Sequence, residues 1–351
     1  MIVNHSHPKP LSSAASRRAV LRGLTSTVTA FGLAGCASLA ATGDRFDAAD
    51  LKVKPTLLVA TTRKPVKNAR ADPWFGPERA ARMTFARATL TPPDGGRFSL
   101  AAVGLSEWKL TSIETVPQVS ELFAQATERR DVLVYIHGFN QSFEWSALSA
   151  ARLADGISFR GETMVFSWPS KEKLFDYGYD RESAMWSRDA LEQVFERLLL
   201  SPNVGRIHIV AHSVGTMLTM ESLRQLYARH GSLMVERVGA IVFASPDIDM
   251  DVFSSSVERI GSLARKITVV AATNDRALAV SGWIAGGITR VGAAEKTRLE
   301  QMGLRVVDAS QEGWGVINHD LFLTNAQIRQ LIRREIEGGG IAASFPPILG
   351  R

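Results

Sequence analysis

Short apolar runs alternate along the chain with longer stretches in which apolar residues recur every three or four positions. Runs without polar–apolar alternation are typical of strands buried on both faces of a parallel sheet. The pattern predicts strands at 55–62, 83–90, 98–103, 131–136, 163–167, 206–211, 238–244, 266–272 and 304–307. The turn signal Pro92-Pro93-Asp94-Gly95-Gly96 separates the second and third of these strands.

The amphipathic stretches predict helices at 142–155, 183–200, 214–229 and 325–337. In the last of them, one face carries Ile328, Leu331, Ile332 and Ile336. Strands that alternate with helices favour an α/β fold, with a mostly parallel central sheet and helices on both faces. We expect this domain to occupy residues 54–337, followed by a C-terminal tail at 338–351.

The N-terminal 35 residues differ in composition from the rest. They contain Lys9, Arg17, Arg18 and Arg22 and no Asp or Glu, and they end in a weakly apolar stretch at 23–35. A bilayer span needs about 20 apolar residues, so the pattern predicts a signal peptide over 1–35 and not a transmembrane helix. Of 41 Lys and Arg, 37 then remain against 35 Asp and Glu, and the net charge falls from +6 to +2. This near-neutral balance argues against a nucleic-acid partner.

Two short motifs in this region indicate an export route and an anchor. Ser16-Arg17-Arg18-Ala19-Val20-Leu21-Arg22 resembles a twin-arginine signal, with an ordinary Sec signal as the alternative. Leu33-Ala34-Gly35-Cys36 resembles a bacterial lipobox, in which the cysteine is lipidated. We expect a periplasm-facing lipoprotein of the cell envelope, held to a membrane by Cys36, with 36–53 as its tether. Ala37 favours the outer membrane, by resemblance to enterobacterial sorting.

Cys36 is the only cysteine of the chain. A single thiol excludes an intrachain disulfide framework and a structural zinc site built on several thiolates. The alternative to lipidation is a buried structural cysteine just after an ordinary signal peptide.

The strongest chemical signal follows the strand at 206–211. Ala211-His212-Ser213-Val214-Gly215 has the small–x–Ser–x–Gly pattern of a nucleophile elbow, and a predicted helix begins at once. Small residues permit the tight turn that presents the Ser213 hydroxyl, and the helix directs its unpaired N–H groups towards it. The pattern predicts Ser213 as a nucleophile, and the alternative is a capping serine at a strand–helix turn.

A serine nucleophile needs a base, and the histidines of the chain differ in their prospects. His208 falls within a strand, His212 occupies the variable position of the elbow, and His230 precedes Gly231, which resembles a helix C-cap. His319 follows the last strand, where the serine–acid–histidine order of such sites places the base. We therefore expect His319 to remove the serine proton.

Two loops offer a carboxylate partner for the base. Asp247 follows the strand at 238–244, and Asp275 follows the strand at 266–272. The second loop lies two strands after the nucleophile, so Asp275 is favoured and Asp247 is the alternative. A carboxylate there orients the imidazole and stabilises its cation.

Backbone donors for an oxyanion are expected after the strand at 131–136, in His137-Gly138-Phe139-Asn140. Gly138 permits a backbone turn that aims amides inward. We expect the N–H groups of Phe139 and Val214 to form the oxyanion hole. His137 is expected to be a structural hydrogen-bonding residue.

From about residue 57 to residue 336 the chain resembles the α/β-hydrolase superfamily, within it bacterial serine esterase- or lipase-like proteins of undefined substrate. The resemblance implies acyl transfer through an acyl-enzyme, on a small-molecule or lipid ester, without metal or cofactor. It favours Asp275 over Asp247, and Ala211 in place of the first elbow glycine departs from the commonest pattern. The matching segments are Ala60-Thr61-Thr62-Arg63-Lys64-Pro65, Tyr135-Ile136-His137-Gly138-Phe139-Asn140, Phe166-Ser167-Trp168-Pro169-Ser170, Asp180-Arg181-Glu182-Ser183-Ala184, Ala211-His212-Ser213-Val214-Gly215, Ser245-Pro246-Asp247-Ile248-Asp249 and Asn274-Asp275-Arg276-Ala277-Leu278.

A different class of function is a non-catalytic envelope lipoprotein that uses the hydrolase scaffold for binding. Its mark is the loss of a triad residue, and Ser213, Asp275 and His319 are all present. Pocket walls are expected from residues 171–180 and 276–300, the second segment being placed to act as a lid. The alternative for both segments is that they are exposed loops that pack on the core.

Overall fold

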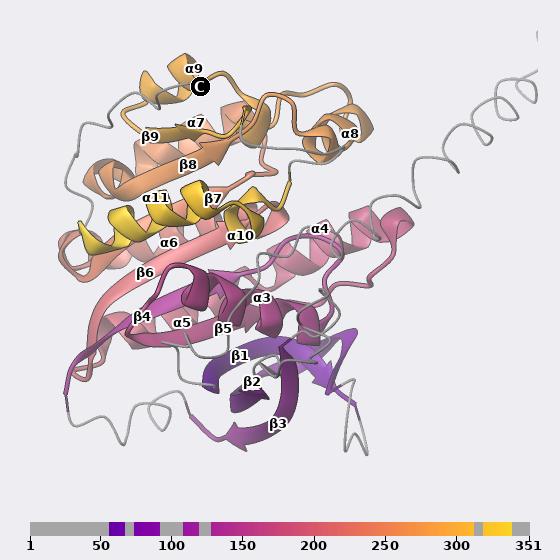
Figure 1. The fold of residues 1–351 in the computed structure, drawn as a ribbon, viewed down its shortest axis with the longest axis vertical. Coiled ribbons are helices and arrows are strands. Elements are labelled where there is room, and N and C mark those ends of the chain that lie inside the picture. Colours follow the sequence, from indigo (N-terminus) through magenta and orange to yellow (C-terminus); the bar gives the residue numbers. More distant parts are fainter. Residues whose placement is uncertain (1–55, 67–73, 92–107, 119–127, 312–318, 339–351) are drawn as a thin grey trace, which may run out of the picture. The chain divides into compact units, whose positions relative to one another are not determined.

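The continuous apolar runs form the middle of a large β-sheet (Figure 1). The computed structural model describes residues 56–66, 74–91, 108–118, 128–311 and 319–338. Within these residues, nine strands pair in the order β3-β2-β1-β5-β4-β6-β7-β8-β9. Their bounds are β1 Thr56–Pro65, β2 Phe75–Thr91, β3 Lys109–Val116, β4 Arg130–Ile136, β5 Glu162–Ser167, β6 Val204–His212, β7 Val238–Ala244, β8 Ile267–Ala271 and β9 Arg305–Asp308.

The sheet is mostly parallel, as predicted. From β1 through β5, β4, β6, β7 and β8 to β9, each neighbouring pair is parallel. Only the pairs β1–β2 and β2–β3, at one side of the described sheet, are antiparallel. The parallel strands all end at one edge, so the loops after them share that edge.

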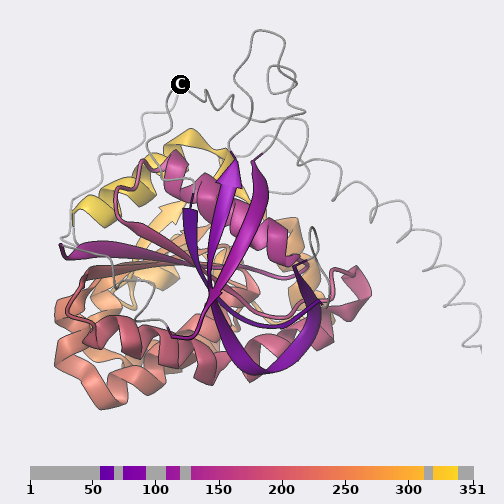
Figure 2. The ribbon, with the colours of Figure 1, turned by 90° about the horizontal axis from the view of Figure 1, so that it is seen from below.

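Helices cover both faces of the sheet, which confirms the predicted fold class. Figure 2 shows one helical layer above the sheet, with α3 and α11, and another below it, with α5 and α6. The helix bounds are α3 Phe143–Gly156, α4 Tyr177–Trp186, α5 Arg188–Leu200, α6 Val214–Arg237, α7 Met250–Arg259, α8 Arg276–Ile284, α9 Lys296–Glu300, α10 Leu321–Thr324 and α11 Ala326–Glu337.

The apolar runs lack alternation because each central strand is buried on both faces. In β4, Val132, Val134 and Ile136 pack in the core beneath α5 and α6. Leu133 and Tyr135 of the same strand pack in the opposite core, beneath α3 and α11. Each of these side chains is at most 1% exposed.

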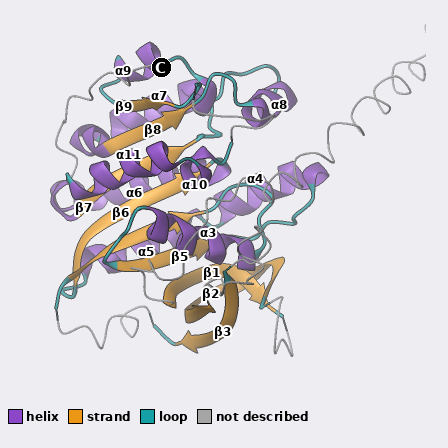
Figure 3. Ribbon diagram, in the orientation of Figure 1, coloured by secondary structure: helices purple, strands orange, loops and turns teal. Residues whose placement is uncertain are grey.

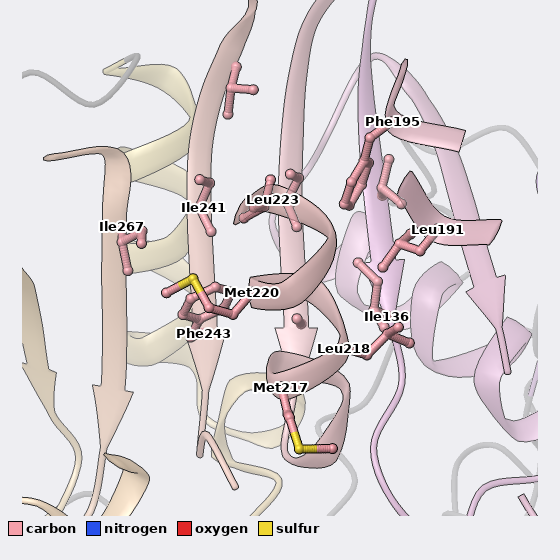
Figure 4. Packing of buried hydrophobic residues seen from close by; sticks show 14 of the residues in the cluster. Ile136, Leu191, Phe195, Met217, Leu218, Met220, Leu223, Ile241, Phe243 and Ile267 are labelled. Carbon is pink, nitrogen blue, oxygen red and sulfur yellow. The ribbon is translucent and has the colours of Figure 1, made fainter. Parts of the chain in front are cut away.

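The longest helix, α6, packs its first turns on the centre of the sheet (Figure 4). Leu218 and Leu223 are completely buried between the helix and the strands. Met217 lies on the first turn, near the ends towards which the neighbouring strands run. The packing therefore holds the start of α6 firmly beside the strand ends, where the preceding residue is Ser213.

The edge strand β3 was not among the predicted strands. Its burial pattern shows no fully buried residue, because it pairs only with β2 and its faces lie largely in solvent. A polar edge strand leaves no apolar run for a sequence pattern to detect. The predicted strand at 98–103 lies outside the described residues.

The helix predicted at 183–200 is wrong as a single element, because the chain breaks at Ser187 into α4 and α5. The Ser187 hydroxyl lies 2.8 Å from the Ser183 carbonyl oxygen and 2.9 Å from the Thr62 hydroxyl. A serine hydroxyl that bonds to the preceding turn loosens or bends a helix. The same contacts tie the break to the end of β1.

The end predicted for α6 near Gly231 is also wrong. The helix kinks at His230, where φ is −124° and ψ is 16°, and then continues to Arg237. It continues because Met234 beyond the kink is buried in the core. His230 Nε2 lies 2.7 Å from Glu196 Oε1 of α5, which places the kinked residue against the neighbouring helix.

The segments predicted as signal peptide and tether, and nearly all of the predicted tail, lie outside the described residues. In the part of the chain that is described, no helix has the length and apolar character needed to cross a membrane.

Candidate active site

The predicted site residues follow neighbouring parallel strands and therefore meet at one edge of the sheet (Figure 3). The oxyanion loop follows β4, Ser213 follows β6, Asp247 follows β7, and Asp275 follows β8. His319 precedes α10 in the segment after β9. Loops at the carboxyl ends of such strands are where open α/β sheets bind their ligands.

Ser213 occupies a strained turn between β6 and α6. Its φ is 50° and its ψ is −122°, a conformation that a residue with a Cβ rarely adopts. The backbone is held there by hydrogen bonds from Ser213 N–H to Ala244 O at 3.0 Å and from Asp247 N–H to Ser213 O at 3.2 Å. The turn thus departs from β6 immediately and enters α6 without an intervening loop.

Small residues around the turn let the neighbouring loop come close. A Cβ on Gly215 would overlap the carbonyl oxygen of His137, and a Cβ on Gly138 would lie 2.9 Å from Ser213 Cβ and 2.8 Å from His212 Nδ1. The loop after β4 is therefore packed directly on the elbow. Glycine at both positions is a steric requirement of this contact.

His319 and Asp275 are in direct hydrogen-bond contact. His319 Nδ1 lies 2.9 Å from Asp275 Oδ2, and the Asp275 side chain is fully buried. The other oxygen, Oδ1, accepts from Leu278 N–H at 3.1 Å and caps α8. Both carboxylate oxygens are therefore occupied, and the carboxylate has one orientation in which to hold the imidazole.

The proximity of the two groups changes their titration. Burial lowers the pKa of His319, but the charge and hydrogen bond of Asp275, helped by Asp320 and Asp247, outweigh burial and raise it to about 9. Burial raises the pKa of Asp275, but the His319 charge and hydrogen bond outweigh burial and lower it. The pair is therefore most stable as imidazolium and carboxylate.

Asp247, the alternative acid, is engaged elsewhere. Its Oδ1 lies 3.0 Å from Arg290 Nε and accepts from Ser281 Oγ at 2.5 Å, and its Oδ2 accepts from Tyr177 Oη at 2.7 Å. The side chains of Asp247 and Arg290 are both nearly completely buried. Asp275, and not Asp247, is the carboxylate hydrogen bonded to His319.

The backbone of His319 is held by two further residues that the sequence did not single out for this purpose. Its carbonyl oxygen accepts from His212 Nε2 at 3.1 Å and from Ser245 Oγ at 3.2 Å. Burial and the nearby His319 lower the pKa of His212 to about 4, so His212 is a neutral donor at pH 7. The sequence around His212 could not reveal this role, because its partner His319 lies 107 residues later in the chain.

The Ser213 hydroxyl makes no hydrogen bond with any described residue, His319 included. Catalytic hydrogen bonds in free enzymes are often long and tighten only when substrate binds. In this structure, therefore, His319 and Asp275 are hydrogen bonded to each other, and Ser213 lies at the same edge of the sheet.

The two predicted oxyanion donors are available. Neither Phe139 N–H nor Val214 N–H donates a hydrogen bond within the described part of the chain. Phe139 directly follows Gly138, which touches the elbow, and Val214 is the first residue of α6. Two N–H groups close to Ser213, neither with a partner among the described residues, have the character of the donors that an oxyanion requires.

His137 has a structural environment. Its ring stacks on Trp168 with centroids 4.6 Å apart, Nδ1 donates to Gly138 O at 2.8 Å, and Nε2 accepts from Trp168 N–H at 3.1 Å. Burial lowers its pKa well below the usual range. A neutral ring with both nitrogens occupied braces the start of the oxyanion loop.

Two buried charges hold the rest of that loop. Arg63 donates from Nη2 to Gln141 O at 2.6 Å and from Nε to Ser167 Oγ at 2.9 Å. Asp180 Oδ2 accepts from Asn140 N–H at 3.3 Å and from the Ser170 hydroxyl at 2.5 Å. Asn140 needs this support because its φ is 60°, in the left-handed region.

Arg63, Ser167, Ser170 and Asp180 belong to segments that carried the family resemblance without a predicted role. Their convergence explains these segments: Arg63, Ser170 and Asp180 each contact the loop that follows β4, and Ser167 accepts a hydrogen bond from Arg63. Among the described residues, no group of three or more His, Cys, Asp and Glu side chains is arranged to hold a metal ion.

A mostly parallel sheet with a strained serine between strand and helix, an aspartate after a later strand, and a histidine in the segment that follows β9 is the arrangement of an α/β hydrolase. The chain belongs to the family described as "Alpha/beta hydrolase of unknown function (DUF900)", which matches residues 117–335. It is also 25% identical over 122 residues to the uncharacterized protein alr1448 of Nostoc sp. strain PCC 7120. That match covers 28% of this chain and 32% of the relative, so the chain spans about a third of that protein's length.

Two solved structures are similar to the chain at low identity. An esterase of Pyrobaculum calidifontis is 12% identical, with 95% of each chain covered and a TM-score of 0.38. Est1E of Butyrivibrio proteoclasticus is 10% identical, with 73% of this chain and 95% of that chain covered and a TM-score of 0.38.

Proposed function

We propose that the protein is a serine hydrolase that cleaves carboxylic esters through an acyl-enzyme intermediate. The observation that carries the proposal is the hydrogen bond of His319 to the fully buried Asp275, at the strand edge where the strained Ser213 stands. A buried carboxylate that is hydrogen bonded to an imidazole, at the same edge of the sheet as a serine in a strained turn, has the chemistry of a nucleophile, a base and an orienting acid.

In the proposed reaction, His319 removes the Ser213 proton while the oxygen attacks the ester carbonyl. The negative charge that develops on the carbonyl oxygen is bound by the N–H groups of Phe139 and Val214. Asp275 stabilises the imidazolium, which returns its proton to the departing alcohol. Water then repeats the sequence on the acyl-enzyme and releases the acid.

The experiment that tests this proposal is labelling of the purified protein with a fluorophosphonate, which reacts with activated serines. We expect the parent protein to be labelled and Ser213→Ala to be unlabelled. Ser255→Ala, a change at an exposed serine of α7, is the matched control and is expected to label like the parent. Labelling that persists in Ser213→Ala would refute the nucleophile assignment.

A series of p-nitrophenyl esters then measures hydrolysis directly and reports the preferred acyl length. The non-catalytic alternative predicts neither labelling nor turnover, while the folded state, followed by circular dichroism, stays intact.

We further propose that the protein is exported and lipidated on Cys36, so that the hydrolase domain faces the periplasm from a membrane. The lipobox-like segment Leu33-Ala34-Gly35-Cys36 and the basic segment before it support this proposal. Metabolic labelling with a palmitate analogue is expected for the full chain and is expected to be lost in Cys36→Ala. Label that remains in Cys36→Ala would reject lipidation at this residue.

A further inference from the structure

Arg181 carries a charge that the described residues do not neutralise. Its guanidinium lies 3.2 Å from Tyr177 Oη through Nη1 and 3.1 Å from Met217 Sδ through Nη2, and no carboxylate within the described chain pairs with it. A guanidinium has five N–H donors, so a hydroxyl and a weakly accepting thioether leave most of them free. The side chain is half-buried and therefore remains accessible.

The neighbours of Arg181 place it at the candidate active site. Met217 lies four residues after Ser213 at the start of α6, near the strand ends (Figure 4). Tyr177 packs edge-on against Phe139, with ring centroids 5.3 Å apart. One contact of the guanidinium is therefore with a residue one helical turn after Ser213, and the other is with a residue that packs on the Phe139 ring.

The acidic groups of the site already have partners. Asp247, which accepts from Tyr177 Oη, is paired with Arg290 at 3.0 Å. Asp275 is paired with His319 at 2.9 Å. Within the described part of the chain, the positive charge of Arg181 is therefore not paired with a carboxylate. A fork of free donors on a cation is suited to a carboxylate or a phosphate.

We propose that Arg181 binds an anionic group of the substrate, so that the enzyme prefers esters that carry a carboxylate or phosphate over neutral esters of equal length. This inference rests on the proposed esterase function and names the substrate class of the same site. Charge-assisted hydrogen bonds of this kind change affinity by roughly tenfold to a hundredfold.

The test compares substrates that differ only in charge. Mono-p-nitrophenyl adipate and p-nitrophenyl hexanoate both have six-carbon acyl chains, and only the first carries a carboxylate. A second pair, butyrylglycerol 3-phosphate and butyrylglycerol, places a phosphate on the alcohol side instead. The two pairs distinguish a carboxylate on the acyl part from a phosphate on the leaving group.

We expect the parent to favour the charged member of at least one pair in kcat/KM. In Arg181→Gln the preference should fall roughly tenfold or more, through KM, while turnover of the neutral ester is retained. Arg181→Lys should restore much of the preference. Arg224→Gln is the matched control, because Arg224 lies on α6 beyond Met217 and is paired with Glu221 at 2.9 Å.

A charged-to-neutral ratio that is the same in the parent and in Arg181→Gln, or a parent that favours the neutral ester in both pairs, would overturn the assignment. The fluorophosphonate reaction separates this result from failure of the proposed function. Ser213-dependent labelling with an unchanged ratio refutes only the role of Arg181. Absence of that labelling in the parent refutes the esterase proposal, and the role of Arg181 with it.

Discussion

The substitution Asp275→Asn tests the acid–base pair most directly, because it removes a charge and preserves shape. In the parent protein the pKa of His319 is raised to about 9 from an ordinary value of 6.5. That rise corresponds to about 3 kcal/mol of preferential stabilisation of the charged imidazole. Burial acts in the opposite direction, and Asp320 and Asp247 raise the pKa less than Asp275 does, so without Asp275 the pKa of His319 should fall well below 9.

The neutral imidazole is the base, so activity should follow its deprotonation. We expect kcat/KM of the parent to rise with pH from 6 and to level off near pH 9. At pH 7 only about 1% of His319 is then neutral. In Asp275→Asn the plateau should begin at a clearly lower pH than in the parent, and its value should be lower by roughly a thousandfold, because the amide favours the wrong tautomer and does not stabilise the cation.

Stability should change with pH in a related way. A group whose pKa is raised by folding stabilises the native state below its unfolded pKa, and the contribution is lost as pH rises through the folded value. The His319 contribution is therefore fully present below pH 6.5 and disappears by about pH 9. Melting temperatures measured across this window should fall more in the parent than in Asp275→Asn.

The assay is a p-nitrophenyl ester hydrolysis series from pH 5.5 to 10, with the product read at its isosbestic wavelength. Asp320→Asn is the matched control, because this half-exposed carboxylate also raises the pKa of His319 but is not hydrogen bonded to it. It should shift the profile by less than Asp275→Asn. A parent plateau that already begins below pH 7, or an Asp275→Asn profile that still rises to pH 9, would refute the reasoning.

Three further substitutions have defined outcomes. Gly138→Ala places a Cβ 2.9 Å from Ser213 Cβ, so fluorophosphonate labelling should slow roughly a hundredfold, while circular dichroism is unchanged; labelling at the parental rate would contradict this. His212→Phe removes the donor to the His319 carbonyl, and kcat should fall about tenfold or more with little change in KM. An effect on KM as large as the effect on kcat would argue against a role of His212 in positioning His319. Asp180→Ala removes the acceptor of Asn140 N–H and should lower the free energy of unfolding by about 1–3 kcal/mol. A urea titration measures this change, and an unchanged midpoint would contradict the prediction.

The central strands and main helices could be predicted because their burial is local in the sequence. The run at 238–244 became β7 with the same bounds, and the helix at 325–337 became α11 with a shift of one residue. Prediction failed where a distant contact decided the outcome. The break at Ser187 depends on Thr62, which lies 125 residues earlier, and α6 continues past His230 because Met234 finds space in the core.

The sequence by itself determined the parts of the site that depend on neighbouring residues. A small–x–Ser–x–Gly segment between strand and helix specifies a tight turn, so Ser213 was identifiable as the residue at that turn. The order of strands likewise predicted that Asp275 and His319 lie in segments that follow later strands of the sheet. The sequence left Asp247 as an alternative acid, because both aspartates follow a strand.

Only the tertiary structure decided which groups touch. It pairs Asp247 with Arg290 and Asp275 with His319, and among the described residues it gives Arg181 no carboxylate partner. It also turns distant segments of the chain into one brace around the oxyanion loop. The physical reason is that hydrogen bonds and ion pairs depend on distances of about 3 Å, and in this fold those distances are set by parallel strands that bring separate loops to a common edge.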